Sequence, residues 1–201
     1  TALHLLYRYG NKSQRQRFIP SLMAGRALVA PTIVLTEVAA HSTEPLRAEP
    51  DGDGYRLNGS LSYVPLGPIA DCVIINATTV EGADSAVIVN RRSEGFETIP
   101  VALMGLRSLP GARLKLHAVH VTNDDLLGEM GSGRVLSDLT VLRSQATIGA
   151  VALGISKAAT QEAVRYSKAR VQFGMPLAKM QATRNKIANL SAGVEAARLL
   201  V

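Results

Sequence analysis

The stretch Asp51-Gly52-Asp53-Gly54-Tyr55-Arg56-Leu57-Asn58-Gly59 carries the most information about the fold. Asp-Gly and Asn-Gly pairs supply the positive φ angles that tight hairpin turns need, and here they bracket a short segment with strand-forming residues. The same alternation of β-branched runs and turn residues continues from Ala27 to Val121. The sequence therefore predicts an antiparallel β-sandwich or barrel-like domain of about 95 residues.

Helical patterns flank this β-rich region. Upstream, residues 11–24 predict a short helix that bends or stops near Pro20 and is capped by Gly25. Downstream of Gly133, apolar residues recur at intervals of three and four, with one break at residues 173–176. We therefore predict an α+β protein with long helices that form an incomplete four-helix bundle. Its three parts are the end of an N-terminal helical domain (residues 1–26), a central β-domain (27–130) and the first part of a C-terminal helical domain (131–201).

Composition restricts the class of partner. The chain has 201 residues with a net charge of +6, which favours anionic partners of any kind. Its basic residues are scattered and only 4% of its residues are aromatic, whereas single-stranded nucleic acid is bound by stacking its bases on aromatic side chains. The longest apolar run, from Ile148 to Ile155, is much shorter than the roughly 20 residues that cross a bilayer. We expect no nucleic-acid binding, no transmembrane segment and no metal site.

The single cysteine and the chain ends give expectations about location and completeness. Cys72 lies in an apolar run and has no second cysteine to pair with, so we expect a buried thiol in a reducing compartment. A bacterial-type cytoplasm fits, and a mitochondrial matrix is the alternative. The chain starts at Thr1 without a signal-like pattern and stops at Val201 inside a helical pattern, so we expect both ends to be cut.

Four short motifs occur in the order and spacing of one protein family. In chain order they are Leu35-Thr36-Glu37-Val38-Ala39-Ala40-His41-Ser42-Thr43, the Asp51–Gly59 stretch, Leu126-Leu127-Gly128-Glu129 with Gly131-Ser132-Gly133, and Tyr166-Ser167-Lys168-Ala169-Arg170-Val171-Gln172-Phe173-Gly174-Met175-Pro176-Leu177 with Gln181. They resemble the T-E-P-x-A-G-S-D, D-G-D-G-Y-x-L-N-G, N-L-L-G-E-x-G-x-G and Y-x-x-x-R-x-Q-F-G-x-P-L-x-x-x-Q segments of acyl-CoA dehydrogenases. Each motif alone is a weak signal, whereas the four together cover essentially the whole chain.

The resemblance implies a flavoprotein oxidoreductase of fatty acid and lipid metabolism. Members of this family bind FAD and remove hydrogen across the α and β carbons of an acyl-CoA thioester. A carboxylate takes the α-proton while a hydride passes to the flavin, which hands the electrons on, commonly to an electron-transferring flavoprotein. The implied partners are therefore FAD, an acyl-CoA substrate, an electron-transferring flavoprotein or similar acceptor, and further subunits of a homo- or hetero-oligomer, either a dimer or a tetramer.

The same resemblance implies roles for residues of the first loop. Leu35 and Thr36 would lie against the flavin ring, with the Thr36 hydroxyl or backbone amides bonded to its pyrimidine edge. Ser42 would lie where cofactor and CoA approach the loop. Ser42 and Arg143 are the substrate-binding candidates.

The signature between the two long helices implies a second set of cofactor contacts. Arg170 would reach the FAD pyrophosphate of a neighbouring subunit, because a planar guanidinium pairs phosphate oxygens bidentately. Phe173 and Gln181 would support the same site across the subunit boundary.

The sequence departs from the family pattern at two places. Tyr63-Val64-Pro65 stands where the family has W-I-T; Tyr63 can still pack on the flavin, but Pro65 has neither a hydroxyl nor an N–H to donate. In the first loop, Val38, His41 and Thr43 replace proline, glycine and aspartate. An exposed loop histidine is a better interpretation of His41 than a catalytic base, because no acid beside it could orient the ring.

No catalytic carboxylate can be assigned, so the catalytic residue is unknown. In most of the family it is a glutamate in the C-terminal half, beyond Val201 here, and in a minority it precedes an arginine on the first long helix. Those helix positions hold Ser144 and Gln145, and Asp138 is better explained by helix capping or exposure. A fragment of an active dehydrogenase and a non-catalytic or half-site subunit of a heteromeric dehydrogenase therefore both stay open. A related flavin oxidase or monooxygenase is a third alternative.

Overall fold

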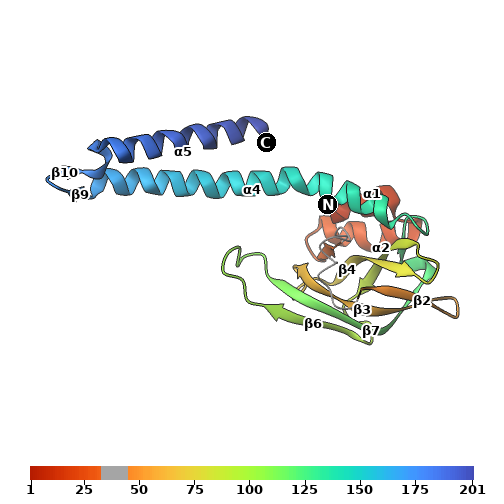
Figure 1. Cartoon of the computed structure of the whole chain (residues 1–201). Coiled ribbons are helices and arrows are strands. Elements are labelled where there is room, and N and C mark those ends of the chain that lie inside the picture. Colours follow the sequence, from red (N-terminus) through yellow and green to blue (C-terminus); the bar gives the residue numbers. More distant parts are fainter. Residues whose placement is uncertain (33–44) are drawn as a thin grey trace. The chain divides into compact units, whose positions relative to one another are not determined.

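The computed structural model describes residues 1–32 and 45–201, which form two compact units, Thr1–Val141 and Leu142–Val201. The first unit contains two short helices, the β-sheet and the beginning of the long helix α4 (Gly133–Ala169). The second unit contains the rest of α4 and the helix α5 (Gln181–Leu200). Figure 1 shows these elements along the chain. The α+β class predicted from the sequence is confirmed.

Two helices open the chain, α1 (Ala2–Tyr9) and α2 (Lys12–Met23). Asn11 begins α2 with a capping box, in which its side chain accepts from the Gln14 N–H at 2.8 Å and the Gln14 side chain accepts from the Asn11 N–H at 3.0 Å. Gly25 ends the helix with a φ of 65°, as predicted. Of the two predicted alternatives, a bend or a stop near Pro20, the stop is wrong, because α2 continues to Met23. Pro20 removes one backbone hydrogen bond, and the caps at Asn11 and Gly25 stabilise both ends of the helix.

An eight-stranded sheet forms the body of the first unit, with strand order β6-β7-β3-β2-β4-β5-β8 and β1 paired to β4. The strands are β1 (Val29–Pro31), β2 (Arg47–Asp51), β3 (Gly54–Pro65), β4 (Cys72–Thr79), β5 (Asp84–Asn90), β6 (Phe96–Val101), β7 (Gly111–Thr122) and β8 (Leu126–Leu127). A 3-10 turn, Asn123–Asp125, precedes β8.

The sheet is mixed, whereas the sequence predicted a wholly antiparallel one. The strands β1 and β2 both pair with β4 in parallel, β1 through Val29 opposite Cys72 and β2 through Arg47 opposite Thr78. Since β5 occupies one edge of β4, β1 and β2 follow one another along its other edge. The remaining pairings are antiparallel, and the longest joins β3 to β7.

The two faces of β4 belong to two hydrophobic cores. Val73 and Ile75 face a cluster that draws side chains from β2, β3, β5 and β7. Cys72 and Ile74 face a second cluster with α1, α2 and the start of α4. Successive strand residues point to opposite faces, so a strand buried on both sides has a continuous apolar sequence. This explains the unbroken run from Cys72 to Ile75.

The second unit is a helical hairpin made by α4 and α5. The break predicted at residues 173–176 is confirmed: the short strands β9 (Val171–Gln172) and β10 (Met175–Pro176) pair there. A 3-10 turn, Leu177–Lys179, follows, and α5 begins at Gln181. A Cβ placed on Gly149 would lie 3.2 Å from Val201 Cγ2, which shows how closely the helices approach.

Many apolar side chains of this hairpin remain exposed, as expected for an incomplete bundle. They include Leu142, Ile148, Val151, Ile155, Leu190 and Leu200. The helix α4 is also long and apolar enough to cross a membrane, as the core helices of many water-soluble proteins are. The absence of a transmembrane segment therefore stays a prediction.

Candidate functional site

The end of β3 presents a half-exposed aromatic ring. A bulge interrupts the β3–β7 pairing between Leu61 and Val64, and such bulges redirect side chains. The Tyr63 ring lies against Gly111 of β7, where an added Cβ would be only 2.1 Å from Tyr63 Cε2. The Tyr63 side chain therefore depends on a glycine at position 111 for its place, and 37% of it is exposed.

The residues after Tyr63 offer few hydrogen-bond donors. Pro65 pairs with Gly111 in the ladder and carries no N–H. The next N–H, that of Leu66, donates to the Pro110 carbonyl at 2.7 Å, and Leu66 adopts a φ of 62°, which is unfavourable for a branched residue. At the W-I-T position of the family pattern, the backbone of residues 65 and 66 therefore has no free N–H to donate to a cofactor.

The first-loop candidates Leu35, Thr36 and Ser42 lie outside the described residues, as do Val38, His41 and Thr43. Their roles stay predictions.

The turn between α4 and α5 gathers the candidates of the second motif. The Arg170 N–H donates to the Tyr166 carbonyl, and the Arg170 carbonyl accepts from the Leu177 N–H at 2.9 Å, so its backbone is fixed from both sides. When the side-chain amide of Gln172 is oriented with its oxygen toward Arg170, that oxygen accepts hydrogen bonds from the guanidinium, from Nη2 at 2.6 Å and from Nε at 3.2 Å. This side chain is thus exposed to solvent but held in one orientation.

Phe173 and Gln181 accompany Arg170 on the same turn. Phe173 adopts a φ of 52°, a costly conformation for an aromatic residue, and its side chain is 90% exposed. Gln181 is the exposed first residue of α5. Arg143, the other basic candidate, is exposed on the same α4 helix but about 40 Å before Arg170, at 1.5 Å per residue. The structure therefore brings the three cofactor candidates to one turn and leaves Arg143 far from them.

The carboxylates of the second unit are engaged elsewhere. Glu162 accepts two hydrogen bonds from Arg165, and Glu195 accepts three from Arg198. These hydrogen bonds lower the pKa of both glutamates, which makes them weaker bases. Within residues 142–201, the sequence contains no other Asp or Glu. The described helical hairpin thus offers no free carboxylate for proton abstraction.

Two polar residues that position these elements were not singled out in the sequence. Gln14 is 3% exposed and donates to the carbonyls of Asp124 and Leu126, each at 2.7 Å, which ties α2 to the turn before β8. Asn76, on β4, donates to the Gly133 carbonyl at 3.1 Å and to Ser137 Oγ at 2.5 Å, which docks the first turn of α4. The capping pattern Asn-x-x-Gln and a lone amide in an apolar strand were the available signals.

Comparison with known proteins agrees with the motifs. Residues 130–201 match the family described as acyl-CoA dehydrogenase, C-terminal domain. The chain is 34% identical over 200 residues to a 3-(aryl)acrylate reductase of Clostridium sporogenes, an alignment that covers 96% of this chain and 52% of the relative.

Two solved structures share the fold. One is butyryl-CoA dehydrogenase from Megasphaera elsdenii, with a TM-score of 0.88, 31% identity and coverage of 98% of this chain and 54% of the other. The second is a glutaryl-CoA dehydrogenase from Mycobacterium smegmatis in complex with FADH2, with a TM-score of 0.86, 25% identity and coverage of 99% and 52%. The chain spans about half the length of the relatives it matches.

A mixed, curled sheet followed by a long helical hairpin is thus the architecture of a known class of oxidoreductases. The chain belongs to the acyl-CoA dehydrogenase family.

Proposed function

We propose that the protein takes part in the FAD-dependent α,β-dehydrogenation of an acyl-CoA thioester. Family membership supports the reaction class, and the relatives named for butyryl-CoA and glutaryl-CoA dehydrogenation support a CoA thioester as the substrate. The observation within this chain that carries the proposal is the turn between α4 and α5. There the family signature coincides with an exposed arginine that Gln172 holds in one orientation.

The residues of this turn fit a pyrophosphate. A guanidinium fixed by a neighbouring amide keeps its remaining N–H groups free for phosphate oxygens and loses little side-chain entropy on binding. FAD, when bound, supplies the acceptor for the hydride that leaves the β-carbon. The task of Arg170 is then to bind the phosphates, and the task of Tyr63 is to pack against the flavin ring with the face that solvent now contacts.

The same turn supports an oligomer. An aromatic side chain that is 90% exposed in a costly backbone conformation indicates a surface that another molecule covers. We propose that Phe173 and Gln181 complete a cofactor site on a second subunit, in a dimer or tetramer. An electron-transferring flavoprotein or a similar protein is the proposed electron acceptor.

A second candidate function is that of a non-catalytic or half-site subunit. One observation favours it: the backbone of residues 65 and 66 cannot donate a hydrogen bond to a cofactor at the W-I-T position. Such a subunit would lend its Arg170 to a flavin held by a homologous partner.

An FAD titration of the full-length protein tests the role of the turn. We expect Arg170→Gln to raise the Kd for FAD by about tenfold or more, the usual loss when a charge-assisted phosphate contact is removed. Arg198→Gln is the matched control, because Arg198 is also an exposed arginine bonded to a neighbouring side chain. Equal Kd values for both variants would contradict the assignment.

The same titration separates the two candidate functions. FAD binding by the protein alone supports the dehydrogenase, whereas FAD binding only with a homologous partner supports the half-site subunit. Turnover should be followed in both directions, because the relative from Clostridium sporogenes is named as an acrylate reductase. Oxygen consumption without another electron acceptor would identify the oxidase alternative.

For localisation we propose a bacterial-type cytoplasm, with a mitochondrial matrix as the alternative. A buried, unpaired thiol at Cys72 agrees with a reducing compartment. Immunodetection in fractionated cells tests this, and recovery in a membrane or secreted fraction would contradict it.

A further inference from the structure

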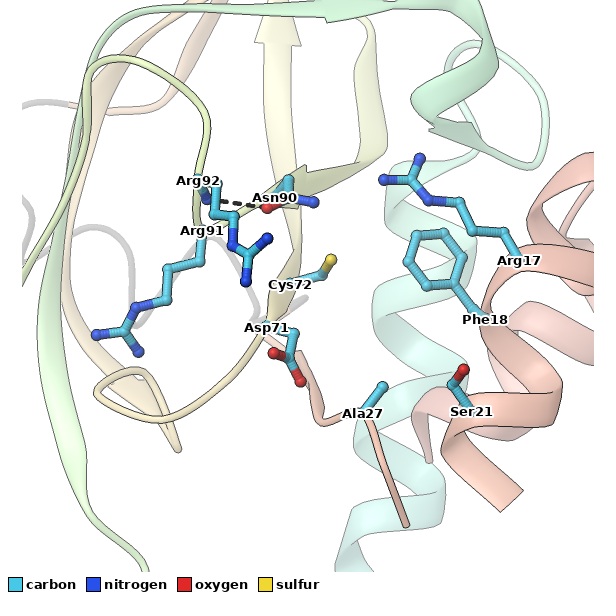
Figure 2. Close-up of a pocket in the computed structure, with 9 residues that line it drawn as sticks. All are labelled: Arg17, Phe18, Ser21, Ala27, Asp71, Cys72, Asn90, Arg91 and Arg92. Atoms are coloured by element: carbon cyan, nitrogen blue, oxygen red, sulfur yellow. Dashed lines mark hydrogen bonds between the residues drawn. The ribbon is translucent and has the colours of Figure 1, made fainter. Parts of the chain in front are cut away.

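A cavity of about 600 Å³ opens in the first unit between α2 and the ends of β4 and β5. Its lining comes from segments far apart in the sequence, as Figure 2 shows. The lining residues are Arg17, Phe18, Ser21 and Ala27, then Asp71 and Cys72, then Asn90, Arg91 and Arg92. A volume of this size falls in the range of about 300–1,000 Å³ that is typical of small-molecule sites.

The charges that line this cavity are unbalanced. Three arginines and one carboxylate belong to the lining, and that carboxylate already accepts the Leu28 N–H through Asp71 Oδ2 at 2.8 Å. Within residues 1–32 and 45–201, no carboxylate lies within 4.0 Å of Arg17, Arg91 or Arg92. The cavity therefore carries an excess positive charge that the described protein does not neutralise.

The three arginines are not equivalent. Arg91 points away from the others in Figure 2, and its Nη1 donates to the Pro68 carbonyl. Arg17 lies with its guanidinium carbon 4.8 Å from the centre of the Phe18 ring, an arrangement that holds the side chain by cation–π attraction. Arg92 extends toward Cys72 in the same view. Arg17 and Arg92 are thus the two cations available to a ligand.

Neighbouring groups add a hydrogen-bond donor and a neutral thiol. Asn90 Oδ1 accepts the Arg92 N–H at 2.8 Å, which leaves the Asn90 NH₂ free to donate toward the cavity. Burial raises the pKa of the Cys72 thiol to about 11, so this side chain is neutral at physiological pH. An anion in the cavity would therefore meet donors and no thiolate.

We propose that this cavity is an anion site that binds a small molecule through a pyrophosphate group, with Arg17 and Arg92 pairing its oxygens and the Asn90 amide donating a further hydrogen bond. Guanidinium groups suit this ligand because their planar forks match phosphate oxygens. The site shares no residue with the candidates for the FAD and acyl-CoA contacts, and it does not depend on the proposed dehydrogenation.

Calorimetric titration of the full-length protein with inorganic pyrophosphate tests the proposal. We expect Arg17→Gln and Arg92→Gln each to raise the Kd by about tenfold or more. Arg113→Gln, at an exposed position of β7 outside the cavity lining, should leave the Kd within about twofold. The same Kd in all four proteins, or no binding up to about 10 mM ligand, would overturn the assignment.

Side-chain NMR of the arginine Nε–Hε groups locates the ligand without any substitution. Pyrophosphate should shift the signals of Arg17 and Arg92, whereas a shift confined to Arg170 would overturn the proposal. A parallel titration with ADP distinguishes the sources of the group. Tighter binding of ADP supports a nucleotide as the ligand, equal binding supports the free anion, and loss of either in Arg92→Gln supports this cavity as the site.

Discussion

The start of α4 provides the sharpest test of the packing, through the substitution Gly133→Ala. A Cβ at this position would lie 2.7 Å from the Asp84 carbonyl oxygen and 2.9 Å from the Ser85 nitrogen, both backbone atoms of β5. Backbone cannot rotate away as a side chain can, so the first turn of α4 would have to move. That movement would also disturb the hydrogen bond of 3.1 Å from Asn76 to the Gly133 carbonyl.

We expect Gly133→Ala to lower the free energy of unfolding by about 1–3 kcal/mol, the usual cost of overpacking. Gly154→Ala is the matched control in the same helix, because nothing lies within 4 Å of its added Cβ. There the alanine should stabilise the helix by about 0.5–1 kcal/mol. Urea unfolding followed by circular dichroism at 222 nm measures both variants. Equal stability of Gly133→Ala and the wild type would refute the close approach of α4 to β5.

Three further predictions concern single side chains. Gly111→Ala should displace the Tyr63 ring, since its Cβ would lie 2.1 Å from Cε2, and FAD titration should then show a higher Kd; an unchanged Kd would argue against flavin packing by Tyr63. Gln14→Leu should lower the free energy of unfolding by about 2 kcal/mol or more in urea unfolding, because loss of the buried amide leaves the carbonyls of Asp124 and Leu126 without a hydrogen-bond donor. The pKa of Cys72 is raised from 9.0 to about 11, so the neutral thiol stabilises the fold fully below about pH 9, and this contribution is lost as pH rises to about 11. Relative to Cys72→Ala, the wild type should lose up to about 2–3 kcal/mol across this window, and parallel pH profiles would contradict the assignment.

Local features of the fold were readable from the sequence because each has a local cause. The Asp-Gly pairs at residues 51–54 predicted a tight turn, and β2 and β3 meet there. The turn predicted at Asn58-Gly59 is wrong, because β3 continues through it to Pro65, and Gly59, with a φ of 130°, lies at a shift in the β3–β7 register. Gly25 predicted a helix end, and its φ of 65° supplies one. The break around Phe173 was visible because Gly and Pro interrupt an otherwise helical pattern.

Features that depend on distant residues could not be read in this way. The parallel pairing of β1 and β2 with β4 depends on which strand takes the other edge of β4, and no periodicity encodes that choice. The arginine cavity joins Arg17 to Arg92 across more than 70 residues of sequence. Gln14 likewise acts on carbonyls 110 and 112 residues away.

The candidate site was predictable only as far as the family motifs reach. The resemblance singled out Arg170, and the structure adds that Gln172 orients its guanidinium. It also singled out Pro65 as a departure, and the structure adds that the neighbouring Leu66 N–H is already bonded to Pro110. These hydrogen-bond partners, Gln172 and Pro110, are set by the backbone conformation of each turn, which a sequence motif does not specify.

The visible absorption spectrum of the purified full-length protein, recorded before and after addition of acyl-CoA, tests the central claim most directly. We predict oxidised flavin bands that bleach when a suitable acyl-CoA is added. A colourless protein that stays without flavin in excess FAD, both alone and with a homologous flavoprotein, would contradict this account.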